Sequence, residues 1–465
     1  MKKLINGLKN YSPPKIIGIL LLLIPIIFSL AKNINLNNDT YFIIKSGNNI
    51  LKHGILYIEP FTMHHNFSFV MQQWLSAIIF AVIYNIGGNL GISIFITSLF
   101  TVIIYLFYKL CSYVSDNKYY LSLFLTLLFS TIVLPLFITS RPQAISFVIY
   151  LLYFNLLERY VKTSKTKYLI PLPILSLLEI NLHGSLFFIL PCFILPYIVE
   201  GILKEFSCFT KDKYKIGPLL VTFILVLLTG FINPYGTDML TYTYKALNNP
   251  YLKYFVTEVK PPSIKETSGL IVYLTIFAIL ICYYFSKRKI KTRYFLLYLG
   301  TTILTICSIR NYCYLLIAGL FPLADYYKDR ARSYKKVNLT KIDKFMVIIV
   351  TCFYLIIICN IVPIGIHRKI RFLRCIRIRC HNCRFCRCNC LGCSILFLSA
   401  ASKQYHTNGA NQPACQFTSS IDFFPHSLLL LFLYLCSSVK SVFINSIIPR
   451  KKRQDVFRIL SFPIF

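Results

Sequence analysis

Long apolar runs separated by short polar stretches dominate this chain. A helix needs about 20 mostly apolar residues to cross a bilayer core, and runs near that length recur along most of the sequence. We therefore predict an all-α polytopic membrane protein with about eleven transmembrane helices. The predicted spans are 16–31, 90–109, 119–138, 143–159, 167–180, 184–203, 215–231, 269–286, 294–309, 312–326 and 345–365.

One more apolar segment, 71–86, decides on which side every later loop lies. The four lysines before the first span place the N-terminus in the cytoplasm by the positive-inside rule. If 71–86 lies on the outer membrane surface, five later inner loops hold two, four, four, five and seven Lys or Arg residues. These loops are 109–118, 159–168, 204–215, 287–293 and 327–344. If 71–86 crosses the membrane, the same loops fall outside, so the charge pattern favours an interfacial helix.

These boundaries divide the chain into four predicted regions. They are the N-terminus and first span (1–31), an outer loop with interfacial helices (32–89), a multi-span membrane domain (90–365) and a tail (366–465). The alternative for the first span is a signal peptide that is cleaved after Ser29-Leu30-Ala31. We expect an uncleaved span, because many spans follow and cleavage would leave Asp39 close to a free N-terminus.

The composition agrees with a membrane protein. The chain is 56% hydrophobic, its mean hydropathy is +0.63 and its formal net charge is +34. Such a charge can indicate nucleic-acid binding, but basic clusters between spans are typical of cytoplasmic membrane loops. We therefore expect a multi-pass protein of the cell membrane that has membrane lipids, and no nucleic acid, as partners.

The predicted topology gathers unusual polar residues on the outer face. Ionisable groups at membrane depth are expensive and tend to mark function, so these residues are the candidates for chemistry. They are Asp39, Glu59, His64, His65, Arg141, His183, Asn233 to Gly236, Glu258, Arg310 and Asn311.

Asp39 lies just after a predicted span, where a carboxylate can activate an acceptor hydroxyl or bind a divalent cation. The alternative is a solvated loop acid in an Asn-rich turn. Glu59 is a second acid in the same loop.

Three other candidates lie on separate predicted helices. Arg141, His183 and Arg310 could together stabilise a departing phosphate. The alternative for both arginines is contact with lipid headgroups, and for the histidine a hydrogen bond to a neighbouring carbonyl.

A dedicated metal site is not expected at His64-His65, because adjacent side chains point apart. Trp74 and the many tyrosines near span ends are typical of the aromatic belt of membrane proteins. The sequence contains no phosphate-binding or dinucleotide-binding motif, so nucleotide-driven energy coupling is not indicated.

The outer loop resembles the N-terminal signature of a group of bacterial and archaeal polytopic proteins. Asp39, Phe42, Gly47, Ile50-Leu51 and His53-Gly54 match its first motif, Glu59-Pro60-Phe61 its second with Glu in place of Asp, and Trp74-Leu75 with Gly87-Gly88 its third. Later elements resemble Arg141-Pro142-Gln143, Asn181 to Gly184 and Asn233 to Gly236. The group is similar to the C-type glycosyltransferases (GT-C), such as protein mannosyltransferases and aminoarabinose transferases.

This resemblance covers roughly residues 15–330. It implies a GT-C-like fold with interfacial helices in the first outer loop, and a polyprenyl-phosphate-linked sugar donor. It also implies that an acid of that loop, here Asp39, is catalytic. We therefore expect sugar transfer to a glycan or protein acceptor on the extracytoplasmic face of the membrane. The alternatives are a non-catalytic transporter or flippase of a lipid-linked glycan, and a membrane scaffold.

The tail from residue 366 breaks the charge pattern. Seven cysteines crowd between Cys375 and Cys393, and eight Lys or Arg residues lie from Arg368 to Arg387 with no acid among them. This tail should lie outside, so its charge contradicts the positive-inside rule. Its cysteines are too dense for one tetrahedral zinc site. We interpret the tail as the product of a shifted reading frame; the alternative is a genuine cationic Cys-rich tail.

Overall fold

The computed structural model describes residues 13–63, 66–203, 209–248, 256–286, 288–329 and 331. The chain divides into two units, Met1–Thr351 and Cys352–Phe465, and all described residues belong to the first. The predicted span 345–365, the tail and His64-His65 lie outside the described residues. The predicted region boundaries therefore stay predictions.

Helices lie at every predicted span up to 312–326, as expected for apolar runs whose backbone groups must pair internally. The helices are α2 (Pro13–Asn33), α3 (Asn38–His53), α4 (Trp74–Val114), α5 (Tyr119–Phe137), α6 (Gln143–Thr163), α7 (Pro171–Leu182), α8 (Ile189–Ile202), α9 (Gly217–Thr229), α10 (Thr237–Leu247), α12 (Thr267–Tyr284), α13 (Thr292–Cys307), α14 (Tyr312–Leu320) and α15 (Leu323–Tyr327). Short 3-10 turns and two strands lie in the connections: η1 (Thr166–Tyr168), η2 (Gly184–Leu186), η3 (Thr257–Val259), η4 (Ile309–Asn311), β1 (Phe209–Thr210) and β2 (Ile290–Lys291).

Five helical segments of the described part are long and apolar enough to cross a membrane. They are Trp74–Val114, Tyr119–Phe137, Gln143–Thr163, Gly184–Ile202 and Thr267–Tyr284. Shorter apolar helices are Leu22–Asn33, Gly217–Thr229 and Thr292–Cys307. The mostly helical membrane architecture is thus confirmed, whereas about eleven spans stay a prediction.

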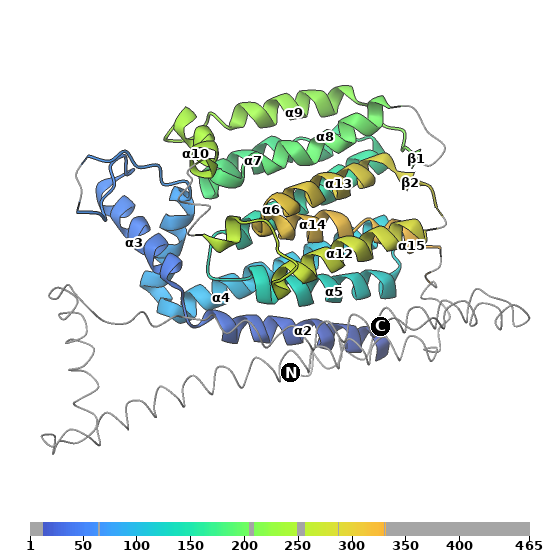
Figure 1. Cartoon of the computed structure of the whole chain (residues 1–465), viewed down its shortest axis with the longest axis horizontal. Helices are drawn as coiled ribbons and strands as arrows, with labels where there is room; N and C mark the ends of the chain where they lie inside the picture. Colours follow the sequence, from blue (N-terminus) through green and yellow to red (C-terminus); the bar gives the residue numbers. More distant parts are fainter. Residues whose placement is uncertain are drawn as a thin grey trace, which may run out of the picture. The chain divides into compact units, whose positions relative to one another are not determined.

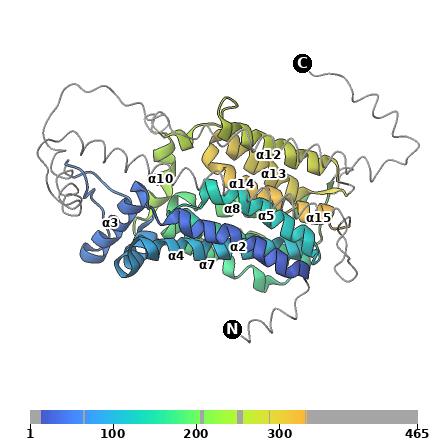
Figure 2. The same cartoon turned by 90° about the horizontal axis from the view of Figure 1, so that it is seen from below.

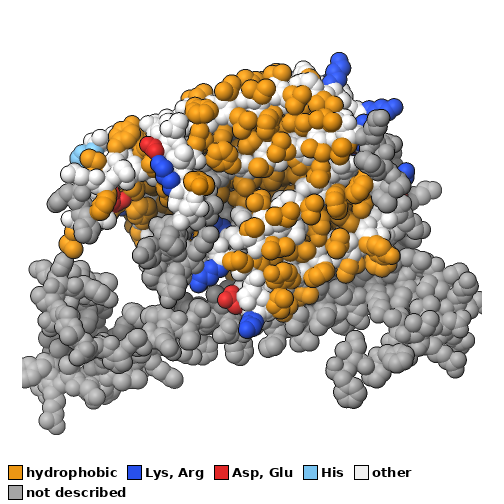
Figure 3. All heavy atoms as spheres, turned by 45° about the horizontal axis from the view of Figure 1, so that its top comes forward, with side chains coloured by type: hydrophobic (Ala, Val, Ile, Leu, Met, Phe, Trp, Pro, Cys, Tyr) orange, Lys and Arg blue, Asp and Glu red, His pale blue; other side chains and the backbone are white. Residues whose placement is uncertain are grey.

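The long helices lie side by side, from α9 at the top of Figure 1 to α2 at the bottom. Figure 2, seen from below, brings α2 to the front, with α3 and α10 at one end and α15 at the other. Helix α4 packs against α2, α5 and α6, while α13 packs against α8 and α14. On the face shown in Figure 3, hydrophobic side chains cover most of the bundle and charged ones lie toward its margins. Such a surface is typical of helices that face lipid.

Helices α2 and α5 run in the same direction. Gly18, early in α2, lies so close to the start of α5 that a Cβ atom there would collide with the Tyr119 hydroxyl. At the other end of α2, Lys32 Nζ donates hydrogen bonds of 2.9–3.0 Å to three carbonyls, those of Leu134, Pro135 and Ile138. The lysine thereby satisfies carbonyls that the end of a helix leaves without partners.

Helix α4 is broken at Gly88, whose φ of 55° is a conformation that glycine adopts without strain. The segment 74–87 before the break packs against α3. After the break, Ser93 Oγ donates to the carbonyl of Leu30, near the end of α2. The segment 74–87 therefore lies at the end of the bundle where α2 finishes. Its position on a membrane surface stays a prediction.

The structure also contains elements that the sequence did not predict. Helix α10 lies within the loop 232–268, and the predicted span 312–326 is divided into α14 and α15. The division falls at Pro322, which has no backbone N–H to continue the helix. Strands β1 and β2 pair in parallel and join two of the predicted inner loops, 204–215 and 287–293.

Candidate functional site

The described residues that the sequence predicts to lie outside gather at one end of the bundle, which we call the Asp39 end (left in Figure 1). It comprises α3, the segments 54–63 and 66–87, and four groups of connections between helices. Hydrogen bonds and ion pairs join these segments. The connections are 138–142, 181–184, 232–266 where described, and 308–311.

Asp39 is positioned by the start of α3. The Asn37 side chain accepts a hydrogen bond of 2.9 Å from the Thr40 backbone N–H, which caps the helix. Asp39 follows in the first turn, where the helix dipole favours a negative charge. The Thr40 hydroxyl lies 2.6 Å from the carbonyl of Ser140, so this turn is held beside the connection that carries Arg141.

Arg141 is shared by two carboxylates from distant parts of the chain. Its guanidinium lies 2.5 Å from Asp39 and 3.4 Å from Glu258. The side chains are 31%, 57% and 52% exposed for Arg141, Asp39 and Glu258. Ion pairs at such exposure each contribute about 0–1 kcal/mol. Arg141 can therefore exchange either partner for another anion at little cost.

Glu59 does not contact the other predicted site residues. Its Oε1 accepts a hydrogen bond of 2.8 Å from the Phe61 backbone N–H, which closes a local turn. The Phe61 ring lies 5.3 Å from that of Phe42, so the turn packs on α3. Within the described residues, no ion pair or hydrogen bond joins Glu59 to Asp39, and its predicted role as a second acid stays a prediction.

His183 is fully enclosed, with 1% of its surface exposed. It ends α7, and its Nδ1 lies 3.1 Å from the Ser146 hydroxyl, while its Nε2 is buried without a hydrogen-bond partner. Burial, and then the positive charge of Arg310, lowers the pKa of His183 to about 3. The imidazole is therefore uncharged at neutral pH. A ligand would meet it as a hydrogen-bond partner and not as a cation.

Arg310 is half-buried in η4. Among the described residues, its guanidinium has no carboxylate partner. Its loop is fixed by two contacts: Ser308 Oγ donates to the carbonyl of Glu258, and the Ile309 N–H donates to that of Lys260. A half-buried guanidinium without a counter-ion is suited to bind an anion.

Several residues of the recognised motifs hold the Asp39 end together. Trp74 Nε1 donates to the Asn181 side chain over 3.1 Å, and Tyr235 OH donates to the Leu56 carbonyl over 3.0 Å. A Cβ atom on Gly47 would stand 2.0 Å from the carbonyl oxygen of Ala77, so only glycine lets α3 approach α4 so closely. These motif positions therefore have structural roles around Asp39.

The described residues contain no group of three or more His, Cys, Asp or Glu side chains that could hold a metal ion. Two carboxylates of the Asp39 end, those of Asp39 and Glu258, both pair with Arg141. A divalent cation at Asp39 therefore stays a prediction.

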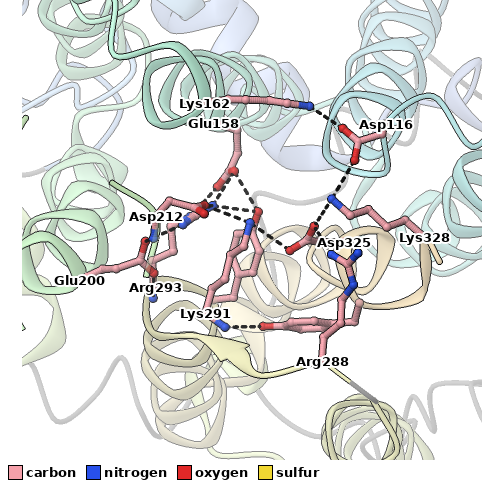
Figure 4. Close-up of polar contacts among 12 residues, drawn as sticks. Asp116, Glu158, Lys162, Glu200, Asp212, Arg288, Lys291, Arg293, Asp325 and Lys328 are labelled. Carbon is pink, nitrogen blue, oxygen red and sulfur yellow. Dashed lines mark hydrogen bonds and ion pairs between the residues drawn. The ribbon is translucent and has the colours of Figure 1, made fainter. Parts of the chain in front are cut away.

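Figure 4 shows a second polar cluster, which the sequence did not predict. It includes residues of β2 and α15, which lie at the opposite end of the bundle (right in Figure 1). We call it the charged end. Its members are Asp116, Glu158, Lys162, Glu200, Asp212, Arg288, Lys291, Arg293, Asp325 and Lys328.

The centre of the charged end is Arg293, which is 1% exposed. Its guanidinium lies 3.1 Å from Glu158, 2.5 Å from Glu200 and 2.8 Å from Asp212. Two tyrosine hydroxyls also donate to Glu158, each over 2.8 Å. Every charge in this buried group has several partners, as a stable buried ion network requires.

A neighbouring group surrounds Asp325, which is 3% exposed. Lys328, Lys291 and Arg288 lie 3.0, 3.1 and 3.7 Å from its oxygens. Lys328 also pairs with Asp116 at 2.8 Å. The charged end therefore joins residues from each of the five loops predicted to lie inside.

One sequence signal could have indicated this cluster. Glu158 and Glu200 stand within or beside otherwise apolar predicted spans, where an acid needs a buried partner. Arg293 lies beside a third span, but the sequence does not reveal which helices face one another.

No family model matches this chain, and no curated protein matches it. Among solved structures, the chain is similar to the oligosaccharyltransferase of Archaeoglobus fulgidus, solved with a tethered acceptor peptide that contains the NVT sequon. The sequences are 13% identical and the TM-score is 0.47, over 74% of this chain and 54% of that chain. The chain thus spans about half the length of that protein.

Proposed function

We propose that this protein is a membrane glycosyltransferase that moves a sugar from a polyprenyl-phosphate-linked donor to an acceptor on the extracytoplasmic face of the membrane. The observation that carries the proposal is the arrangement of charge at the Asp39 end. An exposed carboxylate, Asp39, shares this end with Arg141, whose ion pairs are exposed, and with Arg310, which has no carboxylate partner among the described residues. The apolar surface of the bundle suits the polyprenyl chain of the donor.

In this proposal, Asp39 takes the proton of an acceptor hydroxyl or organises a divalent cation. The acceptor oxygen then attacks the anomeric carbon, and the bond from that carbon to the phosphate oxygen breaks. The lipid phosphate leaves with both electrons of that bond. Arg141 and Arg310 stabilise its charge, because charge-assisted hydrogen bonds from guanidinium groups strengthen as the charge develops.

The other predicted site residues have different roles here. His183 is uncharged, so it would contact the donor through a hydrogen bond. Glu59 would act as a second acid at the rim of the site, where it also closes the turn that packs on α3. The N-terminus and the charged end would face the cytoplasm.

Glycan profiling of a deletion strain tests the proposal. We expect altered surface glycans in the deletion, which wild-type protein restores and Asp39→Asn does not. The purified Asp39→Asn protein should still bind a polyprenyl-phosphate donor. Asp238→Asn is the matched control, because Asp238 is also an exposed acid of this end in an ion pair, 2.9 Å from Lys245.

The same experiment separates the alternatives. If the protein is a flippase of a lipid-linked glycan, Asp39→Asn should restore the glycans as well as Asp238→Asn does. If it is a scaffold, neither Asp39→Asn nor Arg141→Ala should change any glycan. Unchanged surface glycans in the deletion strain would contradict the transferase.

A further inference from the structure

A buried carboxyl group with no role in the mechanism above lies one helical turn before His183 of the Asp39 end. Glu179 lies in α7 and is completely enclosed. Its Oε1 accepts a hydrogen bond of 3.1 Å from Tyr150 OH, whereas its Oε2 has no partner at normal bond geometry. The Ser146 hydroxyl faces this carboxyl group. An ionisable group inside an apolar helix is expensive, so this position calls for a function.

Ser146 connects Glu179 to His183. Its Oγ lies 3.1 Å from His183 Nδ1, and the His183 N–H donates to the Glu179 carbonyl over 2.7 Å, one helical turn back. If Ser146 donates its hydrogen to an acceptor oxygen of the Glu179 carboxyl group, the Ser146 oxygen accepts a hydrogen bond from Nδ1–H of the imidazole. This assignment gives each of the three groups a complementary partner.

The assignment fixes the state of the other ring nitrogen. With the proton on Nδ1, a neutral imidazole has a lone pair on Nε2 and can only accept a hydrogen bond there. Nε2 is buried and has no hydrogen-bond partner, as has Oε1 of Gln72, whose backbone carbonyl accepts from Gly184 over 2.8 Å. Buried acceptors without partners destabilise a protein, so they point to a ligand that supplies a donor.

The neighbouring charge narrows the ligand class. Arg310 acts electrostatically on His183 and has no carboxylate partner among the described residues. A ligand that satisfies both groups carries an anion for the arginine and a neutral donor for the imidazole. A cationic donor such as an ammonium group would be repelled by Arg310.

We propose that His183, held in its Nδ1–H form by Ser146 and Glu179, accepts a hydrogen bond from a sugar hydroxyl close to the phosphate that Arg310 binds. Glu179 and Ser146 are then positioning residues, and His183 distinguishes a glycosyl phosphate from a phosphate without a sugar. This inference rests on the proposed function and specifies the donor for the same site.

Binding of two small phosphates to the purified full-length chain in detergent tests the inference. The probes are glucose 1-phosphate, which has a hydroxyl next to the phosphate-bearing carbon, and methyl phosphate, which has none. We expect His183→Phe to weaken the binding of glucose 1-phosphate about tenfold, which is the effect of one hydrogen bond. The affinity for methyl phosphate should stay unchanged. Arg310→Gln should weaken the binding of both phosphates.

The positioning residues require a separate measurement. In protein labelled with 15N-histidine, the NMR signals that disappear in His183→Phe should show a protonated Nδ1 and an unprotonated Nε2. Ser146→Ala should introduce the Nε2–H form of His183 and weaken the binding of glucose 1-phosphate but not of methyl phosphate. Ser146→Thr retains the hydroxyl, so it should keep the Nδ1–H form and the wild-type affinity for glucose 1-phosphate. Glu179→Leu, which removes the acceptor for the Ser146 hydrogen, should also introduce the Nε2–H form.

The outcomes separate failure of this inference from failure of the proposed function. If neither phosphate binds the wild-type protein, the proposed phosphate site is wrong, and the role of His183 inferred from it is wrong too. If both bind and His183→Phe weakens them equally, the role of His183 is wrong while the phosphate site stands. An Nε2–H imidazole in the wild-type protein would overturn the positioning by Ser146 and Glu179.

Discussion

The two ends of the bundle differ in how their charged side chains are buried and paired. At the charged end, Arg293 is buried and contacts three carboxylates, and its partners Glu158 and Glu200 are buried too. At the Asp39 end, Arg141 pairs with exposed carboxylates and Arg310 has none among the described residues. Buried charges that have several ion-pair partners hold helices together. Exposed charges, and charges without an ion-pair partner, remain available to a ligand. We therefore expect the charged end to stabilise the bundle and the Asp39 end to contact a ligand.

The largest effect is expected from Arg293→Met. It would leave Glu158 and Glu200 buried without their cation, which costs about 3–5 kcal/mol of the free energy of unfolding. Thermal unfolding in detergent should show a large loss of stability.

Arg159→Met is the matched control for that change. Arg159 lies next to Glu158 in α6, but it stacks on the Tyr113 ring at 4.9 Å and has no ion pair within the described residues. Similar losses in the two variants would show that the charged end does not stabilise the bundle through its ion pairs.

A smaller effect is expected from Gly47→Ala at the Asp39 end. The new Cβ would stand 2.0 Å from the Ala77 carbonyl oxygen, so α3 must move away from α4. Overpacking of this kind costs about 1–3 kcal/mol. Trp74 is the only tryptophan of the chain and lies in the first turn of this part of α4, so its fluorescence should change.

Two comparisons sharpen that measurement. Gly87→Ala meets no atom within 4 Å and should leave both the stability and the Trp74 emission unchanged. Folded Arg293→Met should keep the wild-type emission, because the charged end is remote from Trp74. A changed emission there would mean that the two ends are coupled.

The smallest effect concerns Asp116. Partial burial raises the pKa of this carboxyl, but hydrogen bonds from Lys162 and Lys328 outweigh it and lower the pKa to about 2. The usual value is about 3.9, so the folded state favours the charged form and gains stability above that pH. This gain is lost as the pH falls from about 4 to about 2.

Asp116→Asn tests this pH dependence. Unfolding midpoints of the variant should lie slightly below those of the wild type at pH 6 and converge with them near pH 2. The difference should be modest, because Asp116 is 49% exposed. Parallel curves over this pH range would contradict a lowered pKa in the folded protein.

The sequence predicted the helices well because apolar runs of span length have few alternatives to a helix. It also placed Asp39, Arg141, His183 and Arg310 at one end, because the alternation of basic loops determines which connections lie together. Gly87-Gly88 was noted as part of a motif, and the structure explains it by the break in α4.

Other features depend on which helix faces meet, and a single sequence does not contain that information. The pairing of Arg293 with Glu158 and Glu200 joins residues 135 and 93 positions apart. The burial of His183, which makes it neutral instead of cationic, depends in the same way on packing around α7. Helix α10 mixes polar and apolar residues and lacks the long apolar run that indicates a span.

The sequence separation at Arg293 also matters while the protein is being made. Glu158 and Glu200 are synthesised 135 and 93 residues before their cation. At about 5–20 residues per second, these acids wait on the order of ten seconds for it. Until α13 emerges from the ribosome, α6 and α8 enter the membrane with acids that lack their main counter-ion. The order of synthesis therefore makes α13 the helix that completes the ion network around Arg293.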